Sequence, residues 1–313
     1  MNKLPDKLSK EEILEIELEL TGTCNLDCPL CSRSYENAKH LIKYNERSVE
    51  EIKKQLDEYP NIEMCCMAGI ISEPTLHKRF LEIIEYLRSR NIAIELYSNA
   101  SVHSEKWWAE LATLMGPCDR VFFTICGSNQ ELHEKYRVNS SLEKILNNHR
   151  AFKNNCEHPI DTLQHIKFEY NSEDFESKEM QAIRARFSRE ENINTLPYNE
   201  RFKFIEDEDN KIKLSSELAR SYNLIAKNAK RRYQKNKSGE MKCQMRCKSL
   251  EERFVAIDQF GEITPCFLYR IYNGDEKFNL DYTKINKFTY DFCYECEAVT
   301  TQMLEDNGLE RMG

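Results

Sequence analysis

The sequence predicts an α/β fold in which parallel strands alternate with helices. Residues 14–20 alternate strictly between aliphatic side chains and glutamates, which is typical of a strand with one buried face. Further apolar runs of strand length follow, separated by stretches whose apolar residues recur at helical spacing. The chain has 313 residues, 40% hydrophobic and 31% charged, enough for one large core and a smaller domain. Because successive strand and helix pairs form parallel β/α units, we expect the sheet to curve toward a barrel.

The first strand is followed by a helix whose two ends are marked in the sequence. Ser48 and Glu51 form a capping-box pair at its start, and Pro60 ends it. The apolar run 62–69 predicts the second strand. Residues 76–90 carry their apolar side chains on one stripe and predict the second helix.

The same alternation continues along the chain. Further strands are expected at 92–98, 120–126 and 163–170, and further helices at 105–115, after the pair Ser140 and Glu143, and at 175–188. One more strand and a helical connector at 215–233 are expected before the cysteine-rich end. We therefore divide the chain into a barrel at 1–200, a helical connector at 201–242 and a small domain at 243–313.

Composition limits the functional classes. The N-terminal residues lack the apolar core of a secretory signal, and no apolar run of about 18 residues occurs, so we expect a cytoplasmic protein without a membrane partner. Thirteen cysteines in a reducing compartment favour metal ligation or redox chemistry over disulfides. The net charge of -8 disfavours nucleic-acid binding. The basic run 227–242 is either a solvated helix face or a contact for an acidic partner.

Three cysteines, Cys24, Cys28 and Cys31, follow the first strand with C-x3-C-x2-C spacing. Loops at the carboxyl ends of parallel strands gather functional groups. Three thiolates can bind three corners of a cubic iron-sulfur cluster, which leaves one iron free for a substrate or cofactor. Zinc, with a fourth ligand from elsewhere, is the alternative.

With this spacing in this loop, the chain resembles the radical S-adenosylmethionine superfamily. The resemblance implies a partial (β/α)6 barrel and a 4Fe-4S cluster whose open iron binds S-adenosylmethionine. It also implies reductive cleavage of that cofactor to a 5'-deoxyadenosyl radical, which takes a hydrogen atom from the substrate. An electron donor such as flavodoxin or ferredoxin would then be a partner.

The resemblance extends to five positions that would contact S-adenosylmethionine. Ser72 and Glu73 stand where the family shows Gly-Gly-Glu-Pro and would accept hydrogen bonds from the methionine ammonium. Asn99 lies in a stretch similar to Thr-Asn-Gly, and Thr124 in one similar to Ser-Ile-Asp-Gly, so both would lie near the ribose. Arg137 would bind the methionine carboxylate with its forked donors. The structural alternatives are a turn for Asn99 and a surface ion pair for Arg137.

The C-terminal third carries a second set of cysteines. Residues 253–257 and 262–267 resemble the strands of a hairpin, which would bring two of these cysteines together and let a C-x2-C pair complete the site. On spacing alone zinc fits as well as a cluster. The pattern resembles the twitch domain, a short form of the SPASM region, and so implies one auxiliary 4Fe-4S cluster. Its ligands would be Cys247, Cys266, Cys293 and Cys296, with Cys243 as a possible substitute for Cys247.

The resemblance leaves the substrate open. SPASM and twitch enzymes most often modify ribosomally made peptides, by epimerisation, a thioether or a carbon-carbon crosslink. Similar cysteine spacing in aminocyclitol dehydrogenases makes a small carbohydrate-like metabolite the alternative, and a non-enzymatic iron-sulfur or zinc protein is a third reading. Cys126 ends a predicted strand and is expected in the substrate pocket, where a thiol can return a hydrogen atom. Cys65 and Cys66 compete for that role. The alternative for Cys126 is a small buried thiol that packs beneath the loop.

Overall fold

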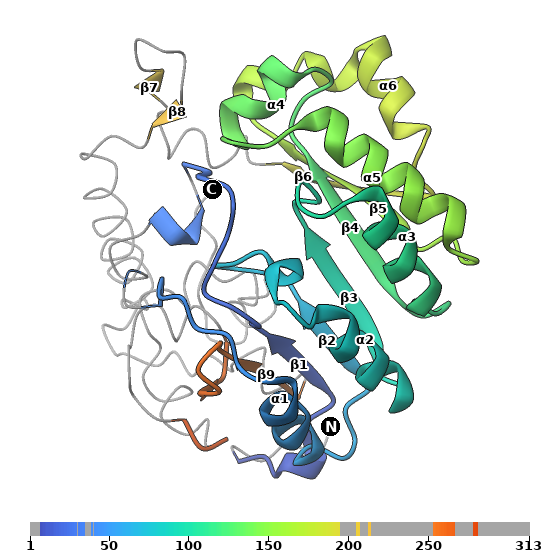
Figure 1. Cartoon of the computed structure of the whole chain (residues 1–313). Coiled ribbons are helices and arrows are strands. Elements are labelled where there is room, and N and C mark those ends of the chain that lie inside the picture. The colour runs from blue at the N-terminus through green and yellow to red at the C-terminus, as the bar shows by residue number, and fades with distance from the viewer. Residues whose placement is uncertain are drawn as a thin grey trace, which may run out of the picture.

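The computed structural model describes residues 7–29, 31–34, 39, 41–194, 205–206, 212–213, 253–266 and 278–280. Among these residues one sheet contains eight strands in the order β10-β9-β1-β2-β3-β4-β5-β6 (Figure 1). Its strands are β1 (Glu15–Leu18), β2 (Met64–Met67), β3 (Ala93–Ser98), β4 (Arg120–Ile125), β5 (Asp161–Lys167), β6 (Arg189–Asn194), β9 (Phe254–Ile257) and β10 (Ile263–Thr264). The helices are α1 (Val49–Asp57), α2 (Phe80–Ser89), α3 (Glu105–Leu114), α4 (Gln130–Tyr136), α5 (Leu142–Asn155) and α6 (Lys178–Arg184). A separate antiparallel ribbon joins β7 (Ile205–Glu206) to β8 (Ile212–Lys213).

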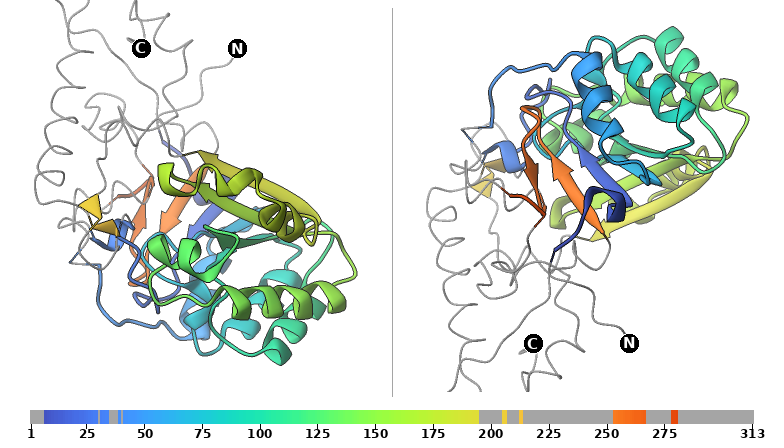
Figure 2. Two further views of the ribbon diagram at one scale, coloured as in Figure 1. Left: turned by 90° about the horizontal axis from the view of Figure 1, so that it is seen from above. Right: turned by 90° about the horizontal axis from the view of Figure 1, so that it is seen from below.

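Strands β1 to β6 are neighbours in chain order and pair in parallel throughout. A helix follows each of the first five strands, and the helices cover one face of the sheet (Figures 1 and 2). The described strands form an open sheet with β10 and β6 at its ends. The predicted parallel α/β architecture is therefore confirmed.

The predicted hairpin near the C-terminus is present, but it belongs to the main sheet. β9 and β10 pair antiparallel, with Ile263 opposite Ile257. β9 also pairs in parallel with β1, with Glu15 opposite Phe254. The expected domain boundaries, between residues 200 and 201 and between 242 and 243, lie outside the described residues, so the three-part division stays a prediction.

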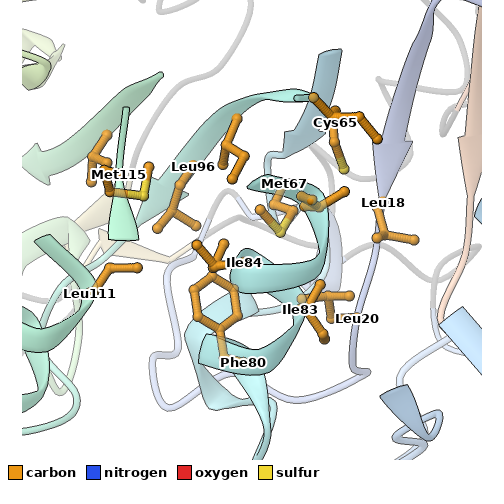
Figure 3. Close-up of a cluster of buried hydrophobic side chains, with 14 of the residues drawn as sticks. Leu18, Leu20, Cys65, Met67, Phe80, Ile83, Ile84, Leu96, Leu111 and Met115 are labelled. Carbon is orange, nitrogen blue, oxygen red and sulfur yellow. The ribbon is translucent and has the colours of Figure 1, made fainter. Parts of the chain in front are cut away.

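The hydrophobic core lies between the sheet and its helices (Figure 3). Alternate side chains of β1 to β4 and of β9 join this core, as the alternation in residues 14–20 predicts for β1. Phe80, Ile83 and Ile84 of α2 pack there against Leu18 of β1 and Leu96 of β3. Each such fully buried side chain contributes about 1.5–3 kcal/mol to stability.

The opposite face of the sheet, here called the inner face, carries polar and aromatic side chains because they alternate with the core residues. The described helices leave this face uncovered (Figure 2). Within the described residues, no helix has both the length and the hydropathy needed to cross a bilayer.

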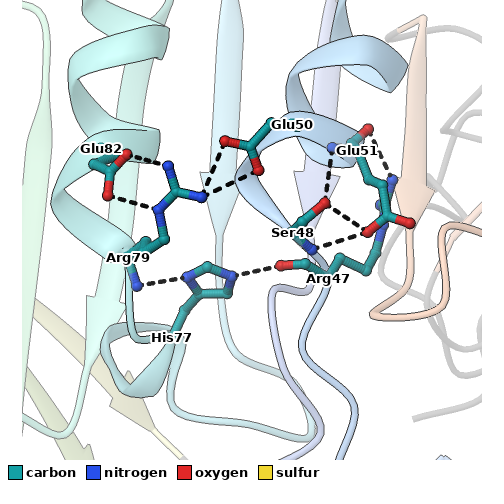
Figure 4. A network of polar contacts seen from close by, with 7 residues as sticks. All are labelled: Arg47, Ser48, Glu50, Glu51, His77, Arg79 and Glu82. Atoms are coloured by element: carbon teal, nitrogen blue, oxygen red, sulfur yellow. Dashed lines mark hydrogen bonds and ion pairs between the residues drawn. The ribbon is translucent and has the colours of Figure 1, made fainter.

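Polar contacts fix the starts of α1 and α2 (Figure 4). The Ser48 hydroxyl accepts a hydrogen bond from the Glu51 N–H at 3.2 Å, and the Glu51 carboxylate accepts one from the Ser48 N–H, which confirms the predicted capping box. Arg79 bridges Glu50 of α1 and Glu82 of α2. These pairs are exposed and weak individually, yet together they orient the loop that follows β2.

Two helical details differ from the prediction. α5 is capped by Ser141, whose hydroxyl accepts from the Lys144 N–H at 3.3 Å, and not by Ser140 with Glu143. The Ser140 hydroxyl instead lies 3.0 Å from the His133 ring Nε2. The short helix α4 was not predicted, because its seven residues are mostly polar and show too little periodicity.

Candidate functional site

The carboxyl ends of adjacent parallel strands bring the predicted site residues to one edge of the sheet. The cysteine loop follows β1 and the loop with Ser72 and Glu73 follows β2, while Asn99 follows β3 directly. Thr124 is part of β4 and Arg137 ends α4. This edge is where α/β proteins place their ligand-binding groups.

The three cysteines of the loop form one buried group with residues from β4 to β5. Cys28 is buried, and Cys24 and Cys31 are half-buried. Burial raises the pKa of the Cys24 thiol to about 12, and the nearby Glu73 charge adds to this effect. Binding iron would therefore displace protons from these thiols.

The donor set fits a cubic cluster. Among the described residues, no three His, Cys, Asp or Glu side chains converge closely enough to hold a single metal ion. Thiolates on a four-iron cluster bind separate irons and need not converge on one point. Three buried or half-buried thiols packed together in one loop are thus suited to the cluster that the spacing predicts.

Glu73 is the centre of a hydrogen-bond network that joins β2 to β3. Its Oε1 accepts from the hydroxyls of Thr75 at 2.6 Å and Ser98 at 2.7 Å, and from the Thr75 N–H at 3.3 Å. Its Oε2 accepts from the Asn99 N–H at 2.8 Å. The carboxylate is only 2% exposed. Glu73 therefore has a clear structural function, and Oε2 retains capacity to accept another hydrogen bond.

Asn99 connects this network to the cysteine loop. Its Nδ2 donates to Asn25 Oδ1 at 2.9 Å and lies 3.9 Å from Cys24 Sγ. Its Oδ1 accepts from the Ser101 N–H at 2.9 Å, so the side chain also shapes the turn after β3. Asn99 thus lies in direct contact with the first cysteine of the loop.

Glu19 is a site residue that the sequence analysis missed. Its carboxylate accepts from the Ser72 hydroxyl at 2.6 Å and from the backbone N–H groups of Ile70 and Ile71. Burial raises the pKa of Glu19 to about 7, although these hydrogen bonds oppose the rise. The strict alternation in 14–20 places Glu19 on the inner face, and that was the available signal. Arg33 also ties the two loops together, through the carbonyls of Gly22 and Ile71.

Thr124 and Arg137 occupy the far side of the site. The Thr124 hydroxyl donates to Gln164 Oε1 at 3.0 Å on β5. The half-buried guanidinium of Arg137 lies against the thiols of Cys28 and Cys126, and its Nε has no partner among the described residues. No described carboxylate forms an ion pair with Arg137, so the surface ion pair considered above is not found there.

Cys126 has the environment of the alternative considered above, a buried thiol beneath the loop, and not that of a thiol exposed in a substrate pocket. It is 0% exposed and packs with Leu26, Tyr136 and Phe168 beneath the cysteine loop. Burial raises the pKa of its thiol to about 11. The two other cysteines considered as hydrogen-atom donors lie in different places. Cys65 lies in the hydrophobic core, and Cys66 lies on the inner face.

The predicted auxiliary site is only partly described. Cys266 follows β10, is half-buried and packs at the margin of the core. Cys243, Cys247, Cys293 and Cys296 lie outside the described residues. The four-cysteine site therefore stays a prediction.

Comparison with known proteins agrees with this geometry. A family model described as the Radical SAM superfamily matches residues 18–175. The tungsten-containing aldehyde ferredoxin oxidoreductase cofactor-modifying protein of Pyrococcus furiosus is 28% identical over 109 residues. That alignment covers 34% of this chain and 29% of the curated relative, so it spans less than a third of that protein.

Solved structures share the fold at low identity. SuiB of Streptococcus suis bound to the precursor peptide SuiA has a TM-score of 0.55 and 15% identity, covering 93% of this chain and 69% of SuiB. The protein anSMEcpe with bound AdoMet and the Kp18Cys peptide has a TM-score of 0.54 and 17% identity, covering 95% and 92%. The expected partial barrel is therefore confirmed.

Proposed function

The chain belongs to the Radical SAM superfamily, and we propose that it cleaves S-adenosylmethionine reductively and abstracts a hydrogen atom from a peptide substrate. The observation that carries this proposal is the contact between the cysteine loop and the network at the ends of β2 and β3. Asn99 lies 3.9 Å from Cys24 Sγ, while Glu73 holds the Asn99 backbone at 2.8 Å. The thiols proposed to bind the cluster and the polar groups proposed to bind the cofactor thus lie at the same edge of the barrel.

Cys24, Cys28 and Cys31 would hold the 4Fe-4S cluster at three of its corners. When bound, this cluster supplies the electron that breaks the sulfonium bond of S-adenosylmethionine. The protein's own task is to bind and orient the cofactor beside it. Burial raises the pKa of each of the three thiols, so they would release protons as the cluster binds.

The remaining site residues suit the two charged ends of methionine and the ribose. Arg137 offers donors to the carboxylate, and its unpartnered Nε leaves capacity for that contact. Glu73 Oε2 and the Ser72 hydroxyl would accept from the ammonium. Asn99 and Thr124 would lie near the ribose hydroxyls.

A peptide substrate is favoured by the two structural neighbours that were solved with bound peptides. The reaction would be an epimerisation, a thioether or a carbon-carbon crosslink. An auxiliary 4Fe-4S cluster at the C-terminal cysteines and a flavodoxin or ferredoxin as electron donor are parts of the same proposal. With these features the protein would belong to the SPASM and twitch subgroup. We also propose that it is cytoplasmic.

The alternative substrate is a small carbohydrate-like or aminocyclitol metabolite. Product mass separates the two reactions, because dehydrogenation gives a product two hydrogens lighter than its substrate. A short precursor peptide encoded beside this chain would favour peptide modification.

The test is anaerobic reconstitution followed by measurement of iron and 5'-deoxyadenosine. Under reduction, the wild-type chain should bind about eight irons and cleave S-adenosylmethionine. Replacing Cys24, Cys28 and Cys31 by alanine should remove about four irons and abolish cleavage. Cys118→Ala, at an exposed cysteine, is the matched control and should change neither. Cleavage by the triple variant would overturn the proposal.

A further inference from the structure

The segment 41–47, here called the strap, lies between the cysteine loop and the turn that joins β9 to β10. It contacts the loop at Gly22, two residues before Cys24. The Gly22 N–H donates to the Asn45 carbonyl at 3.4 Å. A β-carbon at residue 22 would overlap the Lys43 carbonyl oxygen, so only glycine lets the two backbones pack this closely. The strap therefore supports the start of the cysteine loop directly.

The other side of the strap is held by Gln259, a residue of the turn between β9 and β10. Its Nε2 donates to the Leu41 carbonyl at 2.7 Å, and its backbone carbonyl accepts from Asn45 Nδ2 at 2.6 Å. Gln259 and Leu41 are both 0% exposed. Gln259 thus holds both ends of the part of the strap that packs on Gly22.

The turn has its own supports and does not depend on the strap. The Asp258 carboxylate accepts from the backbone N–H groups of Phe260 at 2.8 Å and Glu262 at 2.9 Å. The Glu19 N–H donates to the Ile257 carbonyl at 2.9 Å, which continues the pairing of β1 with β9. The turn is therefore fixed to the strand that leads into the cysteine loop.

The far end of the strap is attached separately. The Arg47 carbonyl lies 2.9 Å from His77 Nε2 (Figure 4). The capping box at Ser48 then begins α1. Loss of the Gln259 contacts would therefore free residues 41–45 without releasing α1.

Packing alone does not explain a glutamine at this position. A buried amide costs free energy unless its polar groups are paired, and Gln259 Oε1 has no partner among the described residues. An apolar side chain of similar size would fill the same space without this cost. The hydrogen bond from Nε2 to the strap is therefore what the amide contributes.

We propose that Gln259 is a positioning residue of the cluster site, because it holds the strap against Gly22 and so keeps Cys24 and Cys28 in place. This inference rests on the proposed function, in which the cysteine loop holds the cluster. Gly22 and Cys24 are two residues apart, so their Cα atoms are at most about 7 Å apart and a shift of one moves the other. The hairpin that carries Gln259 also leads directly to Cys266, a predicted ligand of the auxiliary cluster.

The experiment measures how fast iodoacetamide alkylates each cysteine of the metal-free, full-length chain, with peptide mass spectrometry to separate the sites. Gln259→Met keeps the volume of the side chain and removes its amide, and Asn45→Ala removes the second contact. Either change should speed alkylation of Cys24 and Cys28 at least about fivefold. The reason is that loss of one hydrogen bond from the closed loop raises the population of its open state by about that factor.

Two cysteines of the same chain serve as internal references. Cys118 is exposed and should react at one rate in every variant. Cys65 is 0% exposed in the hydrophobic core, so its alkylation reports unfolding of the sheet. A merely structural role of Gln259 would speed Cys65 and Cys24 by the same factor. Glu262→Gln, an exposed change on the same turn, should match wild type at every cysteine.

Unchanged rates at Cys24 and Cys28 in either folded variant, or an equal rise at Cys65, would overturn the inference. If Gln259→Met does not fold, Asn45→Ala decides alone, because the Asn45 side chain is half-buried and lies outside the core. Iron binding and cleavage of S-adenosylmethionine by the reconstituted wild type test the proposed function separately. Faster alkylation in the variants without iron binding by the wild type would overturn only the proposed function. Iron binding and cleavage without faster alkylation would overturn only this inference.

Discussion

The Asn99 backbone N–H donates a 2.8 Å hydrogen bond to Glu73 Oε2, which fastens the loop after β2 to the end of β3. The same carboxylate accepts hydrogen bonds from the hydroxyls of Thr75 and Ser98, so one side chain holds both its own loop and the end of β3. Because the Asn99 side chain contacts Cys24, Glu73 also helps to position the cysteine loop. A residue expected to contact cofactor therefore has a second function that can be measured without cofactor.

Glu73→Gln should destabilise the cofactor-free protein by about 2 kcal/mol, because the amide nitrogen would face a donor where the carboxylate now accepts. Urea unfolding of the metal-free chain measures this. Glu85→Gln is the control and should unfold at the wild-type midpoint. An unchanged midpoint for Glu73→Gln would contradict the structural function derived from the network.

Arg137→Ala should weaken S-adenosylmethionine binding well over tenfold, since removing one partner of a buried charged contact costs about 2–5 kcal/mol. Arg137→Lys keeps the charge but loses the forked donors, so its affinity for S-adenosylmethionine should lie between those of the wild type and Arg137→Ala. Equilibrium dialysis with reconstituted enzyme measures both. Arg150→Ala, at a side chain that is 63% exposed, should bind like wild type. Wild-type affinity in Arg137→Ala would show that this residue does not hold the cofactor.

Replacing Cys247, Cys266, Cys293 and Cys296 together should remove about four irons while the first cluster remains. Iron analysis with electron paramagnetic resonance of the reduced protein distinguishes the two clusters. Cys243→Ala should leave the iron content unchanged if Cys247 is the ligand. Zinc in this site after anaerobic purification would contradict the auxiliary cluster.

Glu17→Gln should stabilise the protein above neutral pH. The pKa of Glu17 is about 8 in the folded chain and 4.5 for the free side chain, so between these values the folded state binds the extra proton. The stability contributed by the protonated Glu17 side chain is therefore fully present below about pH 4.5, and it is lost as the pH rises to about 8. The variant should remove a loss on the order of 2–4 kcal/mol.

Thermal unfolding at a series of pH values from about 5.5 to about 8.5 measures this effect. Glu19, whose pKa is raised to about 7, contributes a loss of the same sign that fades above that pH. Between pH 7 and pH 8 most of the remaining slope should thus belong to Glu17. An identical slope in wild type and Glu17→Gln would show that the carboxylate is not buried in its ionised form.

Local patterns predicted the elements well where one face of the element is buried. The alternation in 14–20 corresponds to β1, and the Ser48 and Glu51 pair caps α1 as expected. The cap of α5 was misplaced by one residue because two adjacent serines offer the same hydroxyl. Capping chemistry alone does not choose between such neighbours, and the hydrogen bond from Ser140 to His133 decides it through tertiary contact.

The motif positions named from the sequence lie close together in the structure, where Asn99 contacts both Cys24 and Glu73, and their cofactor roles stay predictions. The surroundings of those positions were not predicted. Burial of Glu17 and Glu19 was missed, because alternation gives the face of a residue but not what covers it. Pairing of β9 with β1 was missed for a related reason, since contacts between distant segments leave no periodic signal.

The parallel pairing of β9 with β1 has a consequence for synthesis on the ribosome. β1 emerges early, but its partner on that side begins only at Phe254, so the nascent chain carries β1 as an exposed sheet edge through most of translation. Apolar side chains of β1, such as Ile16 and Leu18, lie along that edge. Chains released by premature termination before residue 254 should therefore aggregate or engage chaperones, whereas chains that include the β9 hairpin close the edge themselves.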